Sequence, residues 1–287
     1  MKSEIQSEET WDLVIKPKAK WLDIDLAEVW RYRDLMLLFV KRDFIAQYKQ
    51  TILGPIWHFI QPILTTVMFL LIFTRVARIP TDGVNPTLFY MSGITIWNYF
   101  SICLTGTSNT FLANAGIFGK VYFPRLIMPL SIIISNLVRF GIQFALLTCA
   151  IIFFSFKGYP VALSAYWLII PILLVMMAGI GLGMGIIISS LTTKYRDFAV
   201  LLTFGVQLLM YGTPIVYPLS YIEKMGLAWI IKLNPLTSLV EAFRFALFGK
   251  GMFSIADLLY SAGFMVVVLV VGVILFNKIE KTFMDTV

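Results

Sequence analysis

The chain of 287 residues is 59% hydrophobic and only 14% charged, whereas soluble domains average about 45–50% apolar and about 25% charged residues. This composition excludes an ordinary soluble globular protein and predicts an all-α membrane protein, because the apolar residues form runs of about 20, enough to cross a bilayer. The net charge of +7 does not indicate nucleic-acid binding, since the basic residues lie mainly at the ends of these runs.

The N-terminal segments are predicted to lie outside the bilayer. Residues 1–25 form a polar tail of mixed charge without the apolar core of a cleavable signal peptide, so we expect this tail in the cytoplasm. Residues 26–53 are predicted to form an amphipathic helix in the plane of the membrane interface, ending in a hinge. Its expected apolar arc consists of Leu26, Val29, Trp30, Met36, Leu37, Val40, Phe44 and Tyr48. The alternative is a helix that packs on a soluble partner domain.

The hinge lies where the surface helix is expected to turn into the membrane. Gly54 and Pro55 should end the helix, because proline clashes with the preceding turn and disfavours a helical residue before it. The hinge residues are Leu53, Gly54, Pro55 and Trp57. They open a transmembrane domain that we place at residues 54–287.

Six apolar runs are predicted to cross the membrane. Their approximate ranges are 56–78, 88–109, 126–154, 166–191, 198–218 and 255–277. An even number of spans places both termini on one side. Of the 23 Lys and Arg residues, 15 then lie in segments on that side, against seven on the other. We therefore expect both termini in the cytoplasm and the chain in the cytoplasmic (inner) membrane.

Two connecting segments differ from plain loops. Residues 114–124, between the second and third spans, are short, inside-facing and tipped with aromatic side chains, so they could dock into a cleft of a cytoplasmic partner. Residues 220–250, on the outer side, are apolar but interrupted by Gly226, Asn234-Pro235 and Gly249. The two helical pieces expected there are too short to span, which predicts re-entrant helices at the outer mouth of a pathway.

The sequence lacks motifs for catalysis or for nucleotide binding. The pairs Gly119-Lys120 and Gly249-Lys250 lack the following Ser or Thr and the upstream glycine of a P-loop. Four glycines lie within one span, without a preceding strand, and so predict close helix packing: Gly179, Gly181, Gly183 and Gly185. The two cysteines and the single histidine, Cys103, Cys149 and His58, are read as packing or hydrogen-bonding residues. We expect no catalytic residue, metal ion or cofactor in this chain.

Several polar and aromatic residues within the spans are candidates for a lining of a pathway. Arg139, flanked by Asn136 and Gln143, is either a functional charge or a structural one, bound to the carbonyls of another helix or part of a polar seam between subunits. Aromatic rings could stack on the apolar faces of sugars, or simply pack in the core. The candidate pore-lining residues are Trp97, Tyr99, Phe100, Arg139 and Tyr211. Glu241 and Arg244, three residues apart, predict a local ion pair.

Two stretches carry a family resemblance. Residues 40–57, followed by Gln61-Pro62, resemble the permease subunit of ABC transporters that export O-antigen, capsular polysaccharide and teichoic acid. Asn234-Pro235-Leu236-Thr237, with Glu241 and Arg244, resembles the same family near its C-terminal end. The resemblance covers nearly the whole chain beyond about residue 25.

The resemblance implies a homodimer bound to two copies of an ATP-binding subunit, which supplies ATP and Mg, and export of a lipid-linked polysaccharide. It implies a coupling helix that docks on the ATPase, formed by Gly116, Ile117, Phe118, Gly119, Lys120, Val121 and Tyr122. The hinge would shape the entrance near the lipid pyrophosphate. Candidate contacts of that pyrophosphate are Arg31, Arg33, Lys41 and Arg42, for which phospholipid is an equally good counter-charge. The implied outer gate contains Asn234, Pro235, Glu241 and Arg244.

Two other functions remain open at this point. An ABC permease for drugs or small lipids would share the architecture and differ only in its lumen. A membrane enzyme acting on polyprenyl-linked sugars would need acidic residues or histidines at the membrane face, of which the sequence offers few.

Overall fold

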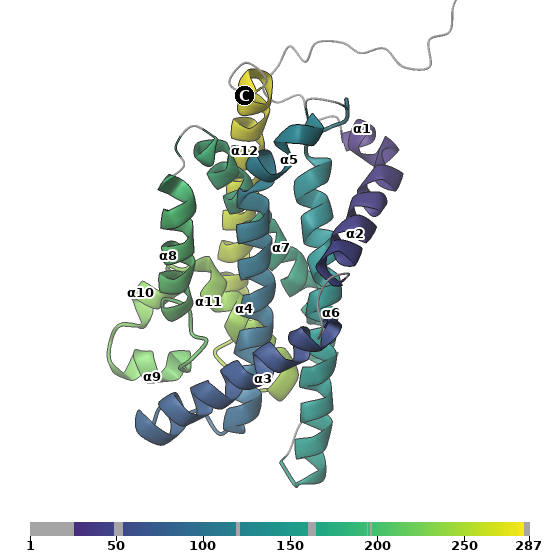
Figure 1. Cartoon of the computed structure of the whole chain (residues 1–287). Helices are drawn as coiled ribbons and strands as arrows, with labels where there is room; N and C mark the ends of the chain where they lie inside the picture. Colours follow the sequence, from purple (N-terminus) through teal and green to yellow (C-terminus); the bar gives the residue numbers. More distant parts are fainter. Residues whose placement is uncertain are drawn as a thin grey trace, which may run out of the picture.

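The computed structural model describes residues 26–48, 54–118, 121–159, 165–193, 195 and 197–283. Every regular element within these ranges is a helix (Figure 1), so the all-α prediction is confirmed. The predicted tail, residues 1–25, lies outside the described residues, as do Leu53, Gly119 and Lys120 of the predicted sites.

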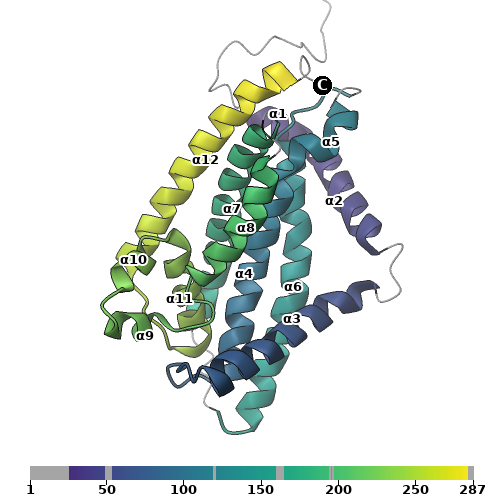
Figure 2. The ribbon, with the colours of Figure 1, turned by 60° about the vertical axis from the view of Figure 1, so that its left-hand side comes forward.

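Four long helices form the body of the molecule and run side by side (Figures 1 and 2). They are α4 (Pro86–Ser108), α6 (Ile127–Phe156), α7 (Ile170–Thr192) and α12 (Ile255–Phe283). The central one is α4, in which every residue from Leu88 to Trp97 is buried. It starts where the Asn85 side chain accepts a hydrogen bond from the Thr87 backbone N–H at 3.0 Å, with Pro86 in the first turn.

The structure supports a multi-pass membrane protein. Four segments of the described chain are long and apolar enough to cross a bilayer: Trp57–Val76, Ile127–Phe156, Ala165–Thr192 and Ile255–Lys278. The predicted second span, 88–109, corresponds to α4, whose 23 residues are long enough but include many polar side chains. The predicted fifth span, 198–218, was too long: α8 (Asp197–Tyr211) has 15 residues, fewer than the roughly 20 a span needs. The six-span count therefore stays a prediction.

The first span crosses the other helices obliquely. It begins as α3 (Trp57–Phe69) and continues as a π-helical segment, Leu70–Val76 (Figure 2). Before it, the short 3-10 turn Gly54–Ile56 opens with Gly54 at φ 44°, a left-handed conformation that favours glycine. The helices on either side of this turn point in different directions.

The predicted surface helix differs from its expected form. It consists of α1 (Leu26–Arg31) and α2 (Arg33–Tyr48), interrupted at Tyr32. Phe39, which is not part of the predicted apolar arc, is buried and packs toward α6, whereas Trp30 and Leu37 of that arc are exposed. The helix therefore has a second apolar side, which packs on its own chain, while part of the predicted arc stays uncovered. The placement of this arc in the membrane interface stays a prediction.

The two ends of the bundle differ in their connections. At one end lie α1, the end of α12 and the short helix α5 (Thr110–Phe118); we call this the α5 end (Figure 1). At the opposite end lie three short helices, α9 (Leu219–Lys224), α10 (Ala228–Lys232) and α11 (Pro235–Phe248). The breaks at Gly226, Asn234-Pro235 and Gly249 are confirmed, but they produce three helical pieces rather than the expected two.

The glycines of α7 allow two other helices to approach its backbone. A Cβ on Gly183 would lie 2.9 Å from the Leu269 backbone nitrogen of α12, and one on Gly185 would lie 2.6 Å from the Thr107 Cβ of α4. Residues two apart on a helix point to opposite sides, so the alternating glycines serve two interfaces. The prediction of small-residue packing is confirmed.

Replacing Gly183 with alanine is expected to destabilise the protein. Because the added methyl group meets backbone atoms that cannot rotate away, we expect a loss of about 1–3 kcal/mol in the free energy of unfolding. Gly205→Ala in α8 is the matched control, since no atom lies within 4 Å of its added Cβ. Thermal melting in detergent measures both variants. Equal melting temperatures for the two variants would contradict the proposed packing.

Candidate functional site

The first candidate region is the short helix α5 and the segment after it. The helical backbone is interrupted at Asn109, between α4 and α5. Side chains of α7 bond the backbone groups that this interruption leaves without a helical partner. The Ser189 hydroxyl accepts a hydrogen bond from the Phe111 N–H at 3.4 Å, and the Thr192 hydroxyl donates one to the Ser108 carbonyl at 3.4 Å. The break is therefore built into the packing of α4 on α7.

Apolar side chains are exposed just after α5. Val121 and Tyr122, which we call the tip, are 58% and 51% exposed, whereas Phe118 and Phe123 on either side are buried. Gly116 is also exposed and Ile117 is half-buried. An exposed apolar tip between two buried anchors has the form of a contact surface for a partner.

The basic residues of α1 and α2 are partly paired with acidic neighbours. Arg42 contacts Asp43 at 2.7 Å, and its guanidinium also lies over the Phe39 ring at 4.8 Å. Arg33 lies 3.9 Å from Asp34. Arg31 and Lys41 are exposed. Of the predicted pyrophosphate contacts, Arg42 is thus the one most occupied by groups of its own chain.

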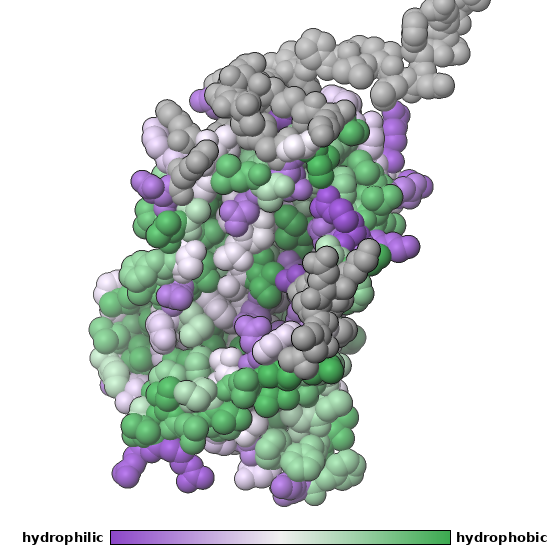
Figure 3. Space-filling view, in the orientation of Figure 1, coloured by the Kyte–Doolittle hydropathy of each residue, from purple (hydrophilic) through white to green (hydrophobic). Residues whose placement is uncertain are grey.

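The second candidate region is a polar stripe along α4, made of Asn98, Ser101 and Thr105 and continued by Asn109, directly after the helix ends. The spacing of three, four and four residues places these side chains on one face, over about 16 Å at the helical rise. They are half-buried or exposed, although the rest of α4 is mostly buried. Figure 3 shows pale and purple surface over this part of the molecule. Thr105 Oγ1 donates to the Ser101 carbonyl at 2.8 Å, which satisfies the hydroxyl within the helix.

Neighbouring helices also carry polar side chains. Asn98 donates a hydrogen bond to Gln143 of α6 at 3.3 Å, and Arg139 of the same helix is half-buried. On α8, which contacts α4, Thr203 and Gln207 are exposed. Exposed polar groups at bilayer depth need water or polar partners, so this face suits an aqueous path better than lipid.

Most of the aromatic residues predicted to line a pore do not lie on this face. Trp97, Tyr99 and Phe100 are at most 5% exposed and pack among α4 and its neighbours, with the Tyr99 and Phe140 rings 5.5 Å apart. That prediction was wrong for these three residues, which are core residues. Tyr211, at the end of α8, is 56% exposed.

The third candidate region is a buried polar clamp at the α9–α11 end. Arg244 and Glu241 of α11, both 2% exposed, form the predicted ion pair at 3.3 Å. The Arg244 guanidinium also donates to the Pro214 carbonyl and, at 2.7 Å, to the Ile215 carbonyl. Burial lowers the pKa of Arg244 to about 10, while the Glu241 carboxylate acts in the opposite direction, so the side chain stays charged at neutral pH.

The clamp also reaches α4 and the loop before α12. The Arg244 guanidinium lies over the Phe89 ring at 3.7 Å. Gly93 makes room for it, because a Cβ there would lie 2.9 Å from the guanidinium. Glu241 accepts a hydrogen bond from the Met252 backbone N–H at 3.0 Å. The ion pair of Glu241 and Arg244 therefore joins α11 to α4, to the turn after α8 and to the loop before α12.

Asn234 anchors the start of α11 to the same turn after α8. Its side-chain oxygen accepts from the Leu236 N–H at 3.0 Å, which caps the helix, with Pro235 in the first turn. Its amide donates to the Gly212 carbonyl at 3.0 Å and to Thr213 Oγ1 at 2.8 Å. All four residues predicted for the outer gate thus take part in attaching α11 to the rest of the fold. Asn234 and Pro235 lie at the start of α11, and Glu241 and Arg244 lie within it.

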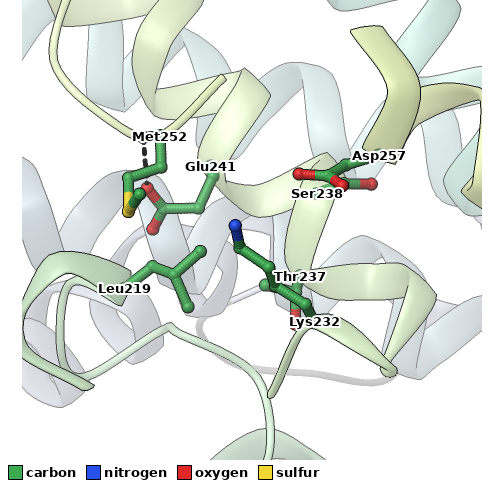
Figure 4. A pocket seen from close by; sticks show the side chains of 7 residues that line it. All are labelled: Leu219, Lys232, Thr237, Ser238, Glu241, Met252 and Asp257. Atoms are coloured by element: carbon green, nitrogen blue, oxygen red, sulfur yellow. Dashed lines mark hydrogen bonds between the residues drawn. The ribbon is translucent and has the colours of Figure 1, made fainter. Parts of the chain in front are cut away.

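A small pocket lies beside the clamp (Figure 4). Lys232 of α10 points into it, between Glu241 on one side and Ser238 and Asp257 on the other. Its remaining lining residues are Leu219, Thr237 and Met252. Among the described residues, no three His, Cys, Asp or Glu side chains lie together as a metal site requires.

The sequence of this chain matches one protein family and is similar to several known proteins. A family model described as ABC-2 type transporter matches residues 34–248. An O-antigen export system permease protein RfbA from Klebsiella pneumoniae is 32% identical over 255 residues, covering 88% of this chain and 94% of that protein. A protein of the same name from Myxococcus xanthus is 24% identical over 263 residues, covering 91% of this chain and 98% of that protein.

Proposed function

Because the chain belongs to the ABC-2 type transporter family, we propose that it is the permease subunit of an exporter for a lipid-linked, O-antigen-like polysaccharide. The observation that carries this proposal is the 32% identity, over 88% of the chain, with a permease named for O-antigen export. The chain has no ATPase activity of its own in this proposal, and a separate ATP-binding subunit supplies the energy, with ATP and Mg.

The polar stripe of α4 is the part of the chain that we assign to the polysaccharide. A hydrated glycan carries many hydroxyl groups, which lose hydrogen bonds unless the wall of the path provides donors and acceptors. Asn98, Ser101, Thr105 and Asn109 supply such groups on a face that this chain leaves open. A second copy of the chain would close the path on its other side, which is why we propose a homodimer with two ATP-binding subunits.

The two ends of the bundle then take different roles. We propose that the tip at the α5 end contacts the ATP-binding subunit in the cytoplasm, with both termini on that side of the inner membrane and six spans in total. The glycan leaves at the α9–α11 end. Because α11 is clamped to α4, the parts of this end that can move during exit are α9 and α10, in which Leu219 alone is buried.

Making the polar stripe apolar is expected to slow export. We expect Thr105→Leu to reduce the export rate about tenfold, as a barrier increase of about 1.4 kcal/mol would. Thr148→Leu in α6 is the matched control, because both threonines bond the carbonyl four residues earlier at 2.8 Å and only Thr105 lies in the stripe. Surface polysaccharide measured over time gives both rates. Equal export by the two variants would remove the stripe from the path.

A genetic test addresses the proposed substrate class. Deleting the gene should abolish surface polysaccharide and leave lipid-linked glycan inside the cell, and a plasmid copy should restore export. Restoration should require the ATP-binding subunit as well. Unchanged surface polysaccharide, together with increased sensitivity to drugs, would instead indicate a permease for small molecules.

A further inference from the structure

Five phenylalanine rings form a continuous row through the α5 end of the molecule. The row runs from Phe39 of α2 to Phe123 beside the tip, then to Phe118 and Phe111 of α5, and ends at Phe276 of α12. Successive ring centroids are 5.7, 5.8, 6.0 and 4.5 Å apart. All five rings are at most 6% exposed. We call this row the phenylalanine ladder.

The ladder is a tightly held unit rather than a chance cluster. Ring pairs at centroid distances of about 4.5–7 Å attract one another beyond the effect of burial alone. Cations cover the rings at two points: Arg42 lies 4.8 Å from the centre of Phe39, and Arg125 lies 5.4 Å from that of Phe118. Ile186 of α7, fully buried, packs in the same cluster. The ladder therefore joins elements that are far apart in the sequence.

The position of the tip depends on two of these rings. Val121 and Tyr122 are exposed, and the buried rings of Phe118 and Phe123 stand on either side of them at 5.8 Å from each other. Since close-packed interiors are poorly compressible, a displacement of the tip moves these rings and the helices packed on them. Leucine could fill much of the same volume but could not reproduce the ring contacts.

We infer that Phe118 and Phe123 are positioning residues, which hold the tip between α2 and α12 so that a push on the tip reaches both helices and changes the distance between them. This inference rests on the proposed function, because the ATP-binding subunit is what would push the tip. Within this cluster, the Phe39–Phe123 contact joins α2 to the segment of the tip, and the Phe111–Phe276 contact joins α5 to α12. Because α2 also packs on α6, removing the Phe123 ring should break the ring contacts between α2 and the tip segment while α2 stays attached to the bundle.

The test measures the distance between α2 and α12 in the complete complex. Spin labels are placed at Leu37→Cys and Val271→Cys, both exposed positions away from the tip, in a background carrying Cys103→Ala and Cys149→Ala. Distances are recorded in nanodiscs with and without a trapped ATP analogue. With the ladder intact, we expect one narrow distance distribution that shifts as a whole when the analogue binds.

Phe123→Ala should broaden this distribution, abolish the shift and reduce export per ATP hydrolysed about tenfold, while ATP hydrolysis continues. Phe123→Leu, a milder change, should give a distance shift and an export rate between those of the intact ladder and those of Phe123→Ala. Phe140→Ala, which removes a buried ring outside the ladder, is the control and should keep the shift. A shift that survives in Phe123→Ala would overturn the ladder while leaving the proposed function intact. Absence of any shift with the ladder intact, in a complex that still exports glycan, would also overturn the ladder alone. A complex that hydrolyses ATP without exporting glycan would overturn the proposed function.

Discussion

Replacing Arg244 with methionine is expected to cause the largest loss of stability of any single substitution in the chain. Removing one partner of a buried ion pair leaves the other charge without compensation, which typically costs about 3–5 kcal/mol. Here the variant would also leave the Pro214 and Ile215 carbonyls without their donor. Because one side chain holds α11, α4 and the turn after α8, we expect little folded protein in the membrane and a strongly lowered melting temperature.

Two further variants test whether the loss of stability comes from breaking the buried ion pair. Lys224→Met removes a basic side chain that is exposed at the end of α9 and should change stability by less than about 0.5 kcal/mol. Glu241→Gln combined with Arg244→Met removes the buried carboxylate as well, and it should recover part of the stability lost in Arg244→Met alone. A melting temperature for Arg244→Met close to that of Lys224→Met would show that the clamp does not stabilise the fold.

Replacing both tip residues, Val121 and Tyr122, with serine should abolish export while leaving the chain folded. Both side chains are more than half exposed, so their loss removes little buried area from the chain itself. The contact they offer to an ATP-binding subunit would lose its apolar anchors, and a few such anchors commonly carry most of the binding energy of an interface. We expect export to fall by about 100-fold or more, the loss that about 2.7 kcal/mol of coupling would produce.

The matched control for the tip is Tyr159→Ser, because this tyrosine is 47% exposed and follows the far end of α6. Co-purification of the ATP-binding subunit, ATP hydrolysis and export are measured for both variants. Serine at the tip should weaken co-purification and export, whereas Tyr159→Ser should retain both. Full export by the serine tip would place the ATPase contact elsewhere on the chain.

The helix ends could be predicted from sequence because their signals are local. Asn234-Pro235 gives both a cap and a proline in the first turn, and Gly249 adopts the left-handed φ of 63° that commonly ends a helix. The end of α8 was missed because Ile215 and Val216 continue the apolar run. Both are buried, yet they lie in a turn. Hydropathy reports burial in an apolar environment, and it does not report the direction of the backbone.

The sites were less accessible to sequence reasoning, for a different reason. The ion pair of Glu241 and Arg244 follows from their spacing on one helix, but the carbonyls of Pro214 and Ile215 carry no sequence signature and come from a turn about 30 residues away. Likewise, Trp97 and Asn98 are neighbours in sequence, and only the packing of α6 and α7 on α4 shows which of them is buried. Such distinctions depend on three-dimensional neighbours.

Reconstituted transport tests the central claim most directly. The chain and its ATP-binding subunit would be placed in liposomes, lipid-linked polysaccharide would be supplied on the side that carries the ATP-binding subunit, and ATP would be added. We predict that glycan becomes protected from an added glycosidase as it crosses, only with ATP and only with an intact tip. ATP hydrolysis without any protected glycan, accompanied by transport of a small lipid or a dye, would contradict the proposed export of polysaccharide.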